Sequence, residues 1–202
     1  MLIIGGGVEH SSKRSTQVTE MARAIRQGGV VAYPTEGVYG LGCDPANQHA
    51  VLRILQIKER PIEKGLILIA ADFMQLEPWV EALEPSLLNP VLDSWPGPVT
   101  WLLPARRDVP VWLRGAHPTL AVRVTDHPLT AALCREVGYP LVSTSANRSG
   151  QEPARSAEAV ESTLGPQIDG ILDGPVGSLS GPTEIRDGYT GRVIRLRPDI
   201  PS

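Results

Sequence analysis

The sequence has few cysteines, few aromatic residues and no long apolar run, and each shortage excludes a class of protein. Its 202 residues include 2 Cys and 1 Phe, and aromatic residues make up only 4%. Cys43 and Cys134 are far apart and form no CxxC pair, so they indicate reduced thiols rather than a disulfide framework or a zinc site. No apolar run approaches the length of a membrane span. We therefore expect a cytoplasmic protein that does not associate with membranes.

Motifs of several enzyme classes are also missing. The 4 His form no HExxH or HxH pattern, so we expect no metal held by protein side chains. The sequence contains neither the GxxxxGK[ST] pattern of P-loop proteins nor the GxSxG pattern of many hydrolases. The formal net charge of -3 argues against a dedicated nucleic-acid coat protein, which would be basic. Any function that needs positive charge must therefore be local.

Apolar segments with strand character alternate with amphipathic segments of helical period. After a flexible leader predicted over residues 1–14, one domain is predicted over residues 15–202. The predicted strands are Val30–Tyr33, Leu66–Ala70, Val99–Leu103, Thr119–Val124 and Leu141–Thr144, with weaker candidates at Gly170–Leu172, Thr183–Arg186 and Arg192–Leu196. This order predicts an α/β fold, an open twisted mixed β-sheet flanked by helices.

Polar residues and prolines indicate where the helices begin. We expect one helix over Thr16–Gln27, and four others that begin after Asn47, Asn89, Asp126 and Ser156 as N-caps. The glycine-dotted stretch after Pro34 and the polar stretch Arg106–His117 are predicted to be loops.

Three cations lie close together where the predicted helix after Asn47 ends. Lys58 and Arg60 flank Glu59, and Lys64 follows just before the next strand. Arginine offers a planar fork of donors and lysine a mobile point charge, a combination that suits a polyphosphate. The alternative is a solvated helix end, where cations interact favourably with the helix dipole. Because Lys58 is in line with the apolar stripe of the helix, we favour the anion site.

A run of small polar residues, Ser143-Thr144-Ser145-Ala146-Asn147, follows the end of another predicted strand. Its hydroxyl, amide and backbone N–H groups can hold an anion or the edge of an adenine ring. A turn that caps the next segment is a serious alternative.

Arg123 stands in an otherwise apolar strand, four residues after Thr119 and therefore on the same face. A buried arginine there needs an anionic or carbonyl partner. The alternative is an edge strand with Arg123 in water. Thr35 with Glu36, Thr183 and Arg197 are weaker candidates, because turn polarity and tail charge explain them equally well.

Several motifs occur together in a familiar order. They are YPTEGVYGLGCDP, KERPIEKGLILIA, WPGPVTWLLPA, TLAVRVTDHP, STSANRSG and PTEIRD. In this combination the chain resembles the YrdC-like family, and more narrowly its short-form members, the threonylcarbamoyl-AMP synthases called TsaC. The family's paired Lys-x-Arg and Ser-x-Asn elements correspond to Lys58-Glu59-Arg60 and Ser145-Ala146-Asn147.

The resemblance implies a YrdC-like fold around a large cationic cavity, and a defined reaction. L-threonine, bicarbonate and ATP, which enters with Mg²⁺, would form threonylcarbamoyl-AMP (L-threonylcarbamoyladenylate) and pyrophosphate. The product would supply the threonylcarbamoyl group for adenosine 37 of tRNAs that read codons beginning with A, through a separate transferase complex.

The resemblance also assigns roles to residues of this chain. Lys58 and Arg60 would be catalytic. ATP would contact Lys58, Arg60, Thr119, Ser145, Asn147 and Arg197, and threonine with bicarbonate would contact Thr35, Lys64, Arg123, Ser143 and Thr183. In many relatives serine stands where this chain has Thr183.

Two other functions compete with this prediction. One is a non-catalytic module that binds double-stranded RNA or tRNA through the same cavity. At a net charge of -3, however, we expect only weak tRNA binding. The other is a carbamoyl transferase that acts on a different acceptor, because YrdC-like domains also occur in larger maturation proteins.

Overall fold

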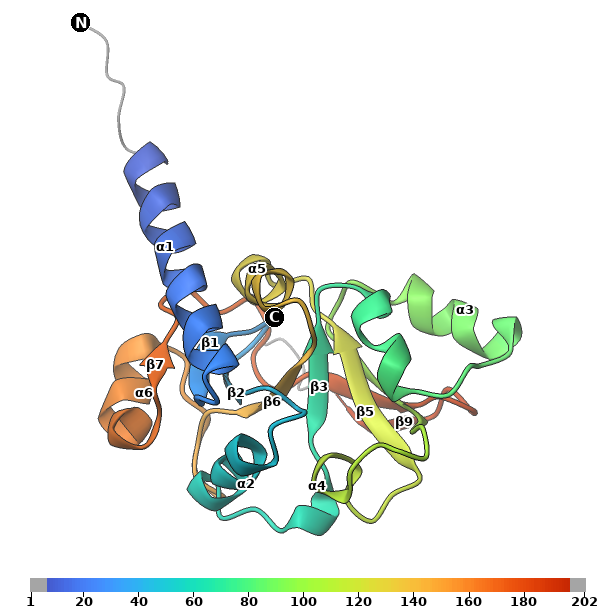
Figure 1. Cartoon of the computed structure of the whole chain (residues 1–202). Helices are drawn as coiled ribbons and strands as arrows, with labels where there is room; N and C mark the ends of the chain where they lie inside the picture. Colours follow the sequence, from blue (N-terminus) through green and yellow to red (C-terminus); the bar gives the residue numbers. More distant parts are fainter. Residues whose placement is uncertain (1–6, 197–202) are drawn as a thin grey trace, which may run out of the picture.

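The fold is built on one mixed β-sheet of nine strands in the order β7-β1-β2-β6-β3-β5-β4-β8-β9 (Figure 1). The computed structural model describes residues 7–196, with side chains from residue 15 onward. β1–β7, β3–β5 and β4–β8 are parallel pairs, and the other neighbours are antiparallel. The strands are Val31–Pro34 (β1), Tyr39–Gly42 (β2), Ile67–Ala70 (β3), Val99–Pro104 (β4), Thr119–Val124 (β5), Leu141–Ser145 (β6), Gly170–Ile171 (β7), Glu184–Asp187 (β8) and Val193–Arg195 (β9). The predicted open mixed sheet with flanking helices is confirmed.

The helices are mostly short and lie in the connections between strands. The α-helices are Gly7–Arg26 (α1), Gln48–Ile57 (α2), Pro85–Asp93 (α3), Val111–Arg114 (α4), Pro128–Val137 (α5) and Ala157–Leu164 (α6). Single 3₁₀ turns cover Ile62–Lys64 (η1), Phe73–Gln75 (η2), Glu77–Trp79 (η3) and Gly165–Gln167 (η4). Asn47 and Ser156 accept hydrogen bonds from the backbone N–H groups of Ala50 and Ala159, so both predicted N-caps are confirmed.

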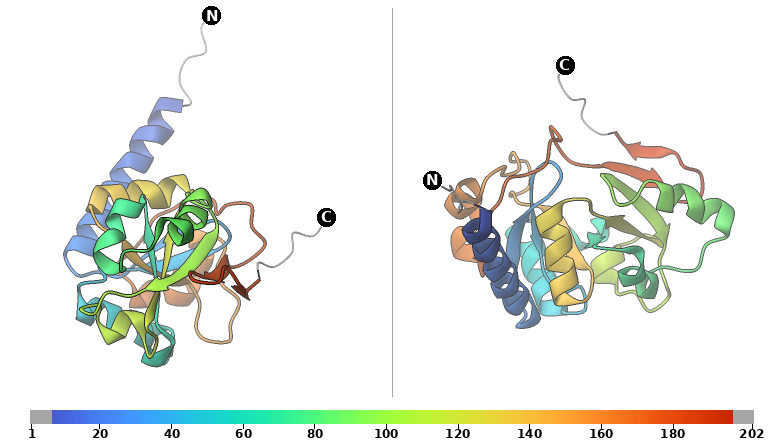
Figure 2. Two further views of the ribbon diagram at one scale, coloured as in Figure 1. Left: turned by 90° about the vertical axis from the view of Figure 1, so that its right-hand side faces the viewer. Right: turned by 90° about the horizontal axis from the view of Figure 1, so that it is seen from above.

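Each face of the sheet has its own apolar core because neighbouring residues in a strand point to opposite sides. Val31 and Tyr33 belong to a cluster with residues of α1 and α5. Val30 and Ala32 belong to the other cluster, which includes residues of α2 and α6. Figure 2 shows α1 and α5 side by side over one face. None of the helices in residues 7–196 is long and apolar enough to cross a membrane.

Two predictions differ from the structure near the chain start and β2. We predicted a flexible leader over residues 1–14, but α1 already begins at Gly7, and residues 1–6 lie outside the described part. The glycine-dotted stretch predicted as a loop contains β2, which forms a hairpin with β1. Position 42 of that strand requires glycine, because a Cβ atom there would lie 2.4 Å from the Val142 carbonyl oxygen and 2.7 Å from the Tyr33 ring. Close packing, rather than a turn, explains this glycine.

Prolines account for the other differences. α3 begins at Pro85 rather than after Asn89, because proline fits the first helical position, and the helix continues through Pro90. The N-cap of α5 is His127, not Asp126, and Pro128 follows it at the first helical position. The stretch predicted as a loop over Arg106–His117 contains the short helix α4.

A long connection joins the two ends of the sheet and crosses near the β1–β2 hairpin. Residues 172–183 run from β7, beside β1, to β8, beside β4 (Figure 2). The backbone N–H groups of Gly177 and Leu179 donate to the carbonyl oxygens of Thr35 and Glu36 at 2.9 and 3.0 Å. Arg155 donates to the carbonyl oxygens of Leu179 and Ser180. We call residues 172–183 the crossing segment.

Asp169 links α2 to the first strand. Its Oδ2 atom accepts hydrogen bonds from the Val30 N–H at 2.7 Å and from Arg53 Nη1 at 2.5 Å. Burial would raise the pKa of Asp169, but these hydrogen bonds outweigh it and hold the pKa below its usual range.

We predict that Asp169→Asn lowers the free energy of unfolding by about 1 kcal/mol near neutral pH, a modest value because the pair is partly exposed. A depressed carboxyl pKa stabilises the fold above the unfolded-state pKa of about 3.9 and ceases to do so as the pH falls through the folded-state value. Denaturant unfolding should therefore show a difference from wild type above about pH 5 that shrinks below about pH 4. Asp93→Asn, at the exposed end of α3, is the control. A difference that did not change with pH would contradict the prediction.

Candidate active site

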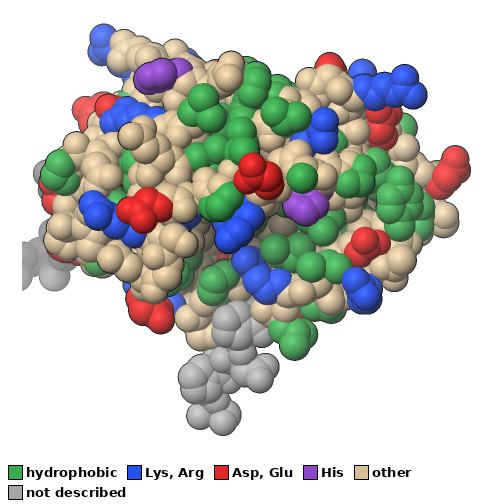
Figure 3. Space-filling model, turned by 90° about the horizontal axis from the view of Figure 1, so that it is seen from below, with side chains coloured by type: hydrophobic (Ala, Val, Ile, Leu, Met, Phe, Trp, Pro, Cys, Tyr) green, Lys and Arg blue, Asp and Glu red, His purple; other side chains and the backbone are tan. Residues whose placement is uncertain are grey.

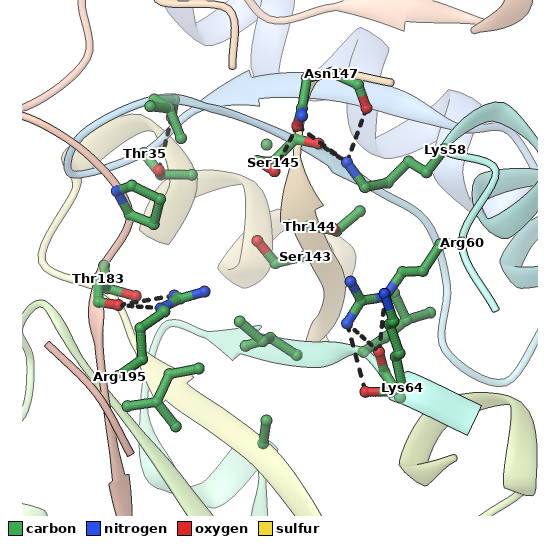
Figure 4. Close-up of a pocket in the computed structure, with 18 of the residues that line it drawn as sticks. Thr35, Lys58, Arg60, Lys64, Ser143, Thr144, Ser145, Asn147, Thr183 and Arg195 are labelled. Atoms are coloured by element: carbon green, nitrogen blue, oxygen red, sulfur yellow. Dashed lines mark hydrogen bonds between the residues drawn. The ribbon is translucent and has the colours of Figure 1, made fainter. Parts of the chain in front are cut away.

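A cavity of about 330 Å³ opens between the β1–β2 hairpin, the end of α2, the loop after β6 and the end of the crossing segment. Its lysine and arginine lining residues are Lys58, Arg60, Lys64, Arg114, Arg123 and Arg195, and His117 lines it as well. None of the described residues that line it is Asp or Glu. Figure 3 shows Lys, Arg and His side chains near the centre of one face, and Figure 4 shows how the labelled side chains converge on a pocket.

A Schellman motif at the end of α2 sets the positions of Lys58 and Arg60. The Arg60 N–H donates to the Leu55 carbonyl oxygen at 2.9 Å, and the Glu59 N–H donates to the Gln56 carbonyl oxygen at 3.1 Å. Glu59 has a φ of 50°, in the left-handed region that this motif requires at its C′ position. The reversal of the backbone at Glu59 places two cations of one short segment at the same cavity.

Lys58 is buried and bound to neutral oxygens. Its Nζ atom donates to the carbonyl oxygens of Ser145 and Asn147 at 2.5 and 2.9 Å and to Asn147 Oδ1 at 3.1 Å. Burial, and then repulsion from Arg60, lower the pKa of Lys58 to about 8. Lys58 is only 5% exposed, so the alternative of a solvated helix end is wrong.

Arg60 is half-buried and held by the backbone of the next turn. Its Nε and Nη2 atoms both donate to the Gly65 carbonyl oxygen, at 3.1 and 2.9 Å. Burial lowers the pKa of its guanidinium. Gly65 has a φ of 62°, and a Cβ atom there would lie 2.9 Å from the Arg114 carbonyl oxygen. Lys64 is exposed at the rim of the cavity.

The polar run after β6 both lines the cavity and forms a turn. Ser143, Thr144, Ser145 and Asn147 all line it. Ser145 Oγ donates to Asn147 Oδ1 at 2.6 Å, and Asn147 Nδ2 donates to the Gln151 carbonyl oxygen at 2.7 Å. The same residues therefore line the cavity and form the turn that we treated as the alternative.

Arg123 is buried at the centre of the sheet, because β5 lies between β3 and β4. Its exposed fraction is 4%, so the alternative of an edge strand is wrong. Its Nη2 atom lies 3.2 Å from Glu36 Oε2, and its Nη1 atom donates to Thr183 Oγ1 at 2.6 Å and to Thr100 Oγ1 at 3.3 Å. Thr125 Oγ1 donates to Glu36 Oε1 at 2.6 Å. Arg123 thus has the anionic partner that its burial requires.

Of the remaining predicted residues, two line the cavity, one does not, and one lies outside the described residues. Thr35 and Thr183 line the cavity, and Thr35 Oγ1 donates to the Val38 carbonyl oxygen at 2.7 Å. Thr119 lies on the same strand face as the lining residues Ala121 and Arg123 but does not itself line the cavity. Arg197 lies outside the described residues.

Three residues that line the cavity were missed from the sequence, namely Arg195, Arg114 and His117. Glu36, a weaker candidate in the sequence, compensates the charge of Arg123. Arg195 could have been found only from strand pairing, because it stands opposite Ile185, another lining residue. Within the described part of the chain, no three His, Cys, Asp or Glu side chains form a metal-binding group.

Comparison with known proteins identifies the family of this chain. The Sua5/YciO/YrdC family model, described as telomere recombination, matches residues 23–198. The chain belongs to the Sua5/YciO/YrdC family. Among curated members, the threonylcarbamoyl-AMP synthase of Nitrosococcus oceani is 59% identical over 174 residues, which cover 86% of this chain and 94% of that protein. The threonylcarbamoyl-AMP synthase of Coxiella burnetii (strain RSA 493) is 49% identical over 179 residues, which cover 89% of this chain and 96% of that protein.

Solved structures of family members have the same fold. P. abyssi Sua5 complexed with L-threonine superposes with a TM-score of 0.81 at 34% identity. The match covers 86% of this chain and 51% of the Sua5 chain, so this chain spans about half of that protein. E. coli YciO matches with a TM-score of 0.78 at 28% identity, and the match covers 90% of this chain and 89% of the YciO chain. The predicted resemblance to the YrdC-like family is confirmed.

We predict that Glu59→Gly maintains or raises the free energy of unfolding, by up to about 1 kcal/mol, because glycine adopts positive φ without a Cβ clash. Glu59→Val should lower it, because a β-branched residue tolerates the left-handed region poorly. Chemical denaturation of both variants measures the difference. A less stable glycine variant would mean that the Glu59 side chain, rather than the backbone at that position, stabilises the turn.

Proposed function

We propose that this chain is a threonylcarbamoyl-AMP synthase that joins L-threonine, bicarbonate and ATP and releases pyrophosphate. The single observation that carries the proposal is a cavity lined by cations that are held by neutral oxygens and are therefore available to anions. All three substrates carry negative groups, and a site without lining carboxylates lowers the repulsion between them. The names of the relatives agree, and this chain spans 94% and 96% of two of them.

Two groups of residues serve the two halves of the reaction. We assign Lys58, Arg60, Ser145 and Asn147 to the ATP side. Thr35, Lys64, Arg123, Ser143 and Thr183 are assigned to threonine and bicarbonate. Thr119 and Arg197 are left out of the direct contacts, because Thr119 does not line the cavity and Arg197 lies outside the described residues.

The chemistry consists of two bond-forming steps. The threonine amine attacks the carbon of bicarbonate, and loss of water leaves a carbamate. A carbamate oxygen then attacks the α-phosphorus of ATP, and the bond to the bridging oxygen of the β-phosphate breaks with its electron pair on pyrophosphate. Neither step needs a protein nucleophile, so the residues contribute positioning and charge stabilisation.

We propose that Mg²⁺ enters with ATP and is held by phosphate oxygens and water. The lining residues offer hydroxyl, amide and backbone oxygens rather than the carboxylates that usually hold this ion. Mg²⁺ would shield phosphate charge, while Lys58 and Arg60 orient the chain of phosphates.

We also propose a cytoplasmic role in which a separate transferase complex passes the threonylcarbamoyl group to adenosine 37 of tRNA. The two cysteines are buried and free, as expected for a protein that functions with reduced thiols. The chain itself should bind tRNA only weakly. A function limited to RNA binding is not favoured, because the named relatives are synthases.

We predict that the purified protein converts ATP, L-threonine and labelled bicarbonate into a labelled adenylate and pyrophosphate. Arg60→Ala should slow the reaction roughly a hundredfold or more, by analogy with the loss of an oxyanion-hole donor. Arg60→Lys should recover only part of the rate, because lysine lacks the planar fork. Arg107→Ala, an exposed arginine outside the cavity, should leave turnover unchanged. Absence of product with threonine and Mg²⁺ present would refute the proposed function.

We predict that ATP affinity falls as the pH rises above about 8, the value to which burial lowers the pKa of Lys58. Below that pH the ammonium is charged and attracts phosphate, and above it the attraction is lost. Calorimetric titration of ATP without threonine or bicarbonate, between about pH 7 and 9.5, isolates this effect, because the phosphates are already ionised over most of that range. Lys58→Met should bind ATP more weakly and with a flatter pH dependence. An unchanged slope in Lys58→Met would assign the titration to another group.

A further inference from the structure

Arg155 does not line the cavity, but it joins two segments that form the cavity walls. It belongs to residues 146–156, which connect β6 to α6 and which we call the β6–α6 loop. Its Nη1 and Nη2 atoms donate to the carbonyl oxygens of Ser180 and Leu179, at 2.9 and 3.0 Å. One planar guanidinium therefore holds two consecutive carbonyl groups of the crossing segment, a geometry that lysine cannot reproduce.

The residue before Arg155 is anchored to the sheet, so the arginine side chain extends from a fixed point. Ala154 donates its backbone N–H to the Ala146 carbonyl oxygen at 3.0 Å, and its own carbonyl oxygen accepts from the Tyr39 N–H of β2 at 2.8 Å. Among the described residues, no carboxylate forms an ion pair with Arg155. The guanidinium thus contacts the crossing segment rather than an acidic side chain on the surface.

The part of the crossing segment that Arg155 holds leads directly into the cavity wall. Residues 181–183 follow it and line the cavity. The crossing segment has three glycines and two prolines and forms no helix or strand, so hydrogen bonds from its neighbours must set its path. Arg155 holds it just before this wall, and Arg123 holds it at Thr183, with Nη1 2.6 Å from Oγ1. The position of the wall therefore depends on both arginines.

The other end of the β6–α6 loop carries the nucleotide half of the proposed site. Asn147 Nδ2 donates to the Gln151 carbonyl oxygen at 2.7 Å, so the side chain that we assign to ATP also holds the loop backbone. A ligand that engages this amide must share or replace that hydrogen bond, and either change acts on the backbone of the loop. A continuous series of hydrogen bonds thus runs from Asn147 through the loop and Arg155 to the wall that bears Thr183.

We propose that Arg155 is a positioning residue that connects the wall bearing Thr183 to the loop bearing Asn147, so that bound nucleotide tightens the binding of threonine. The identity of the two ligands rests on the proposed function, whereas the connection rests on the hydrogen bonds. Without the guanidinium, residues 181–183 would be held less firmly, and the cost of ordering them would oppose threonine binding. ATP alone does not need this wall. By linkage, threonine should tighten the binding of nucleotide by the same factor.

Calorimetric titration of L-threonine into the full-length protein, with and without a saturating ATP analogue, measures this coupling. The analogue has a methylene group between its α- and β-phosphorus atoms, so pyrophosphate cannot leave. In wild type the analogue should tighten threonine binding by about 5-fold or more, within the usual range of coupling between sites. Arg155→Gln should reduce that factor to about 1–2 and change the affinity for the analogue alone by less than about 2-fold. Arg155→Lys should restore only part of the coupling, because lysine lacks the planar fork.

A matched variant and a kinetic measurement separate positioning from a general loss of stability. Arg148→Gln removes an exposed arginine side chain from the same loop, outside the cavity lining, and should retain wild-type coupling. In turnover, Arg155→Gln should raise the KM for threonine by about 5-fold and leave the KM for ATP nearly unchanged. A destabilised fold would not produce this difference between the two substrates.

Three results would overturn the inference alone: equal weakening of both ligands in Arg155→Gln, wild-type coupling in that variant, or uncoupled binding of threonine and the analogue in wild type. Coupled binding that depends on Arg155, in a protein that forms no adenylate, would support the inference and refute the synthase function. Absence of threonine binding in wild type would refute both.

Discussion

The buried ion pair between Arg123 and Glu36 is the constraint on which the arrangement of the pocket depends. Arg123 is 4% exposed and Glu36 5%, so neither charge can be satisfied by water. Removing one partner of such a pair typically destabilises a protein by about 3–5 kcal/mol, because the other charge is left uncompensated. Thr100 and Thr183 complete the pair from β4 and from the segment just before β8. Satisfying one guanidinium therefore holds together the β1–β2 hairpin, the neighbouring strands β4 and β5, and the crossing segment.

Most of the fold could be predicted because apolar runs, caps and helix-ending glycines are local signals. Five predicted strands match β1, β3, β4, β5 and β6 within a residue or two. β2 could not be predicted, because its glycines resemble a loop until the Tyr33 ring and the Val142 carbonyl are known to press against Gly42. Likewise, the position of Pro90 inside α3 depends on the chain beginning its helix at Pro85. These failures occur where tertiary packing outweighs local preference.

The candidate site was predictable where its residues are contiguous and unpredictable where strand register decides. Lys58, Arg60 and the run Ser143–Asn147 are short segments, so their proximity within each motif follows from the sequence. That Lys58 binds the backbone of the second motif does not, because 87 residues separate it from Ser145. Arg195 points to the cavity only because β9 pairs with β8 in one register, with an irregularity between Ile185 and Arg186. The register of a strand pair and the contact between distant segments are not encoded in any local sequence pattern.

Buried cations in the pocket need hydrogen-bond partners, but a partner of opposite charge would cancel their attraction for an anionic ligand. A carboxylate partner, as Glu36 is for Arg123, satisfies a buried cation but also cancels its attraction for a ligand. Lys58, Arg60 and Arg195 are held instead by carbonyl and amide oxygens, which fix geometry without cancelling charge. Burial lowers the pKa of each of the three, because desolvation disfavours the charged form. A polyanion bound beside them would favour the charged form, and if it bound only the folded state it would also stabilise the fold.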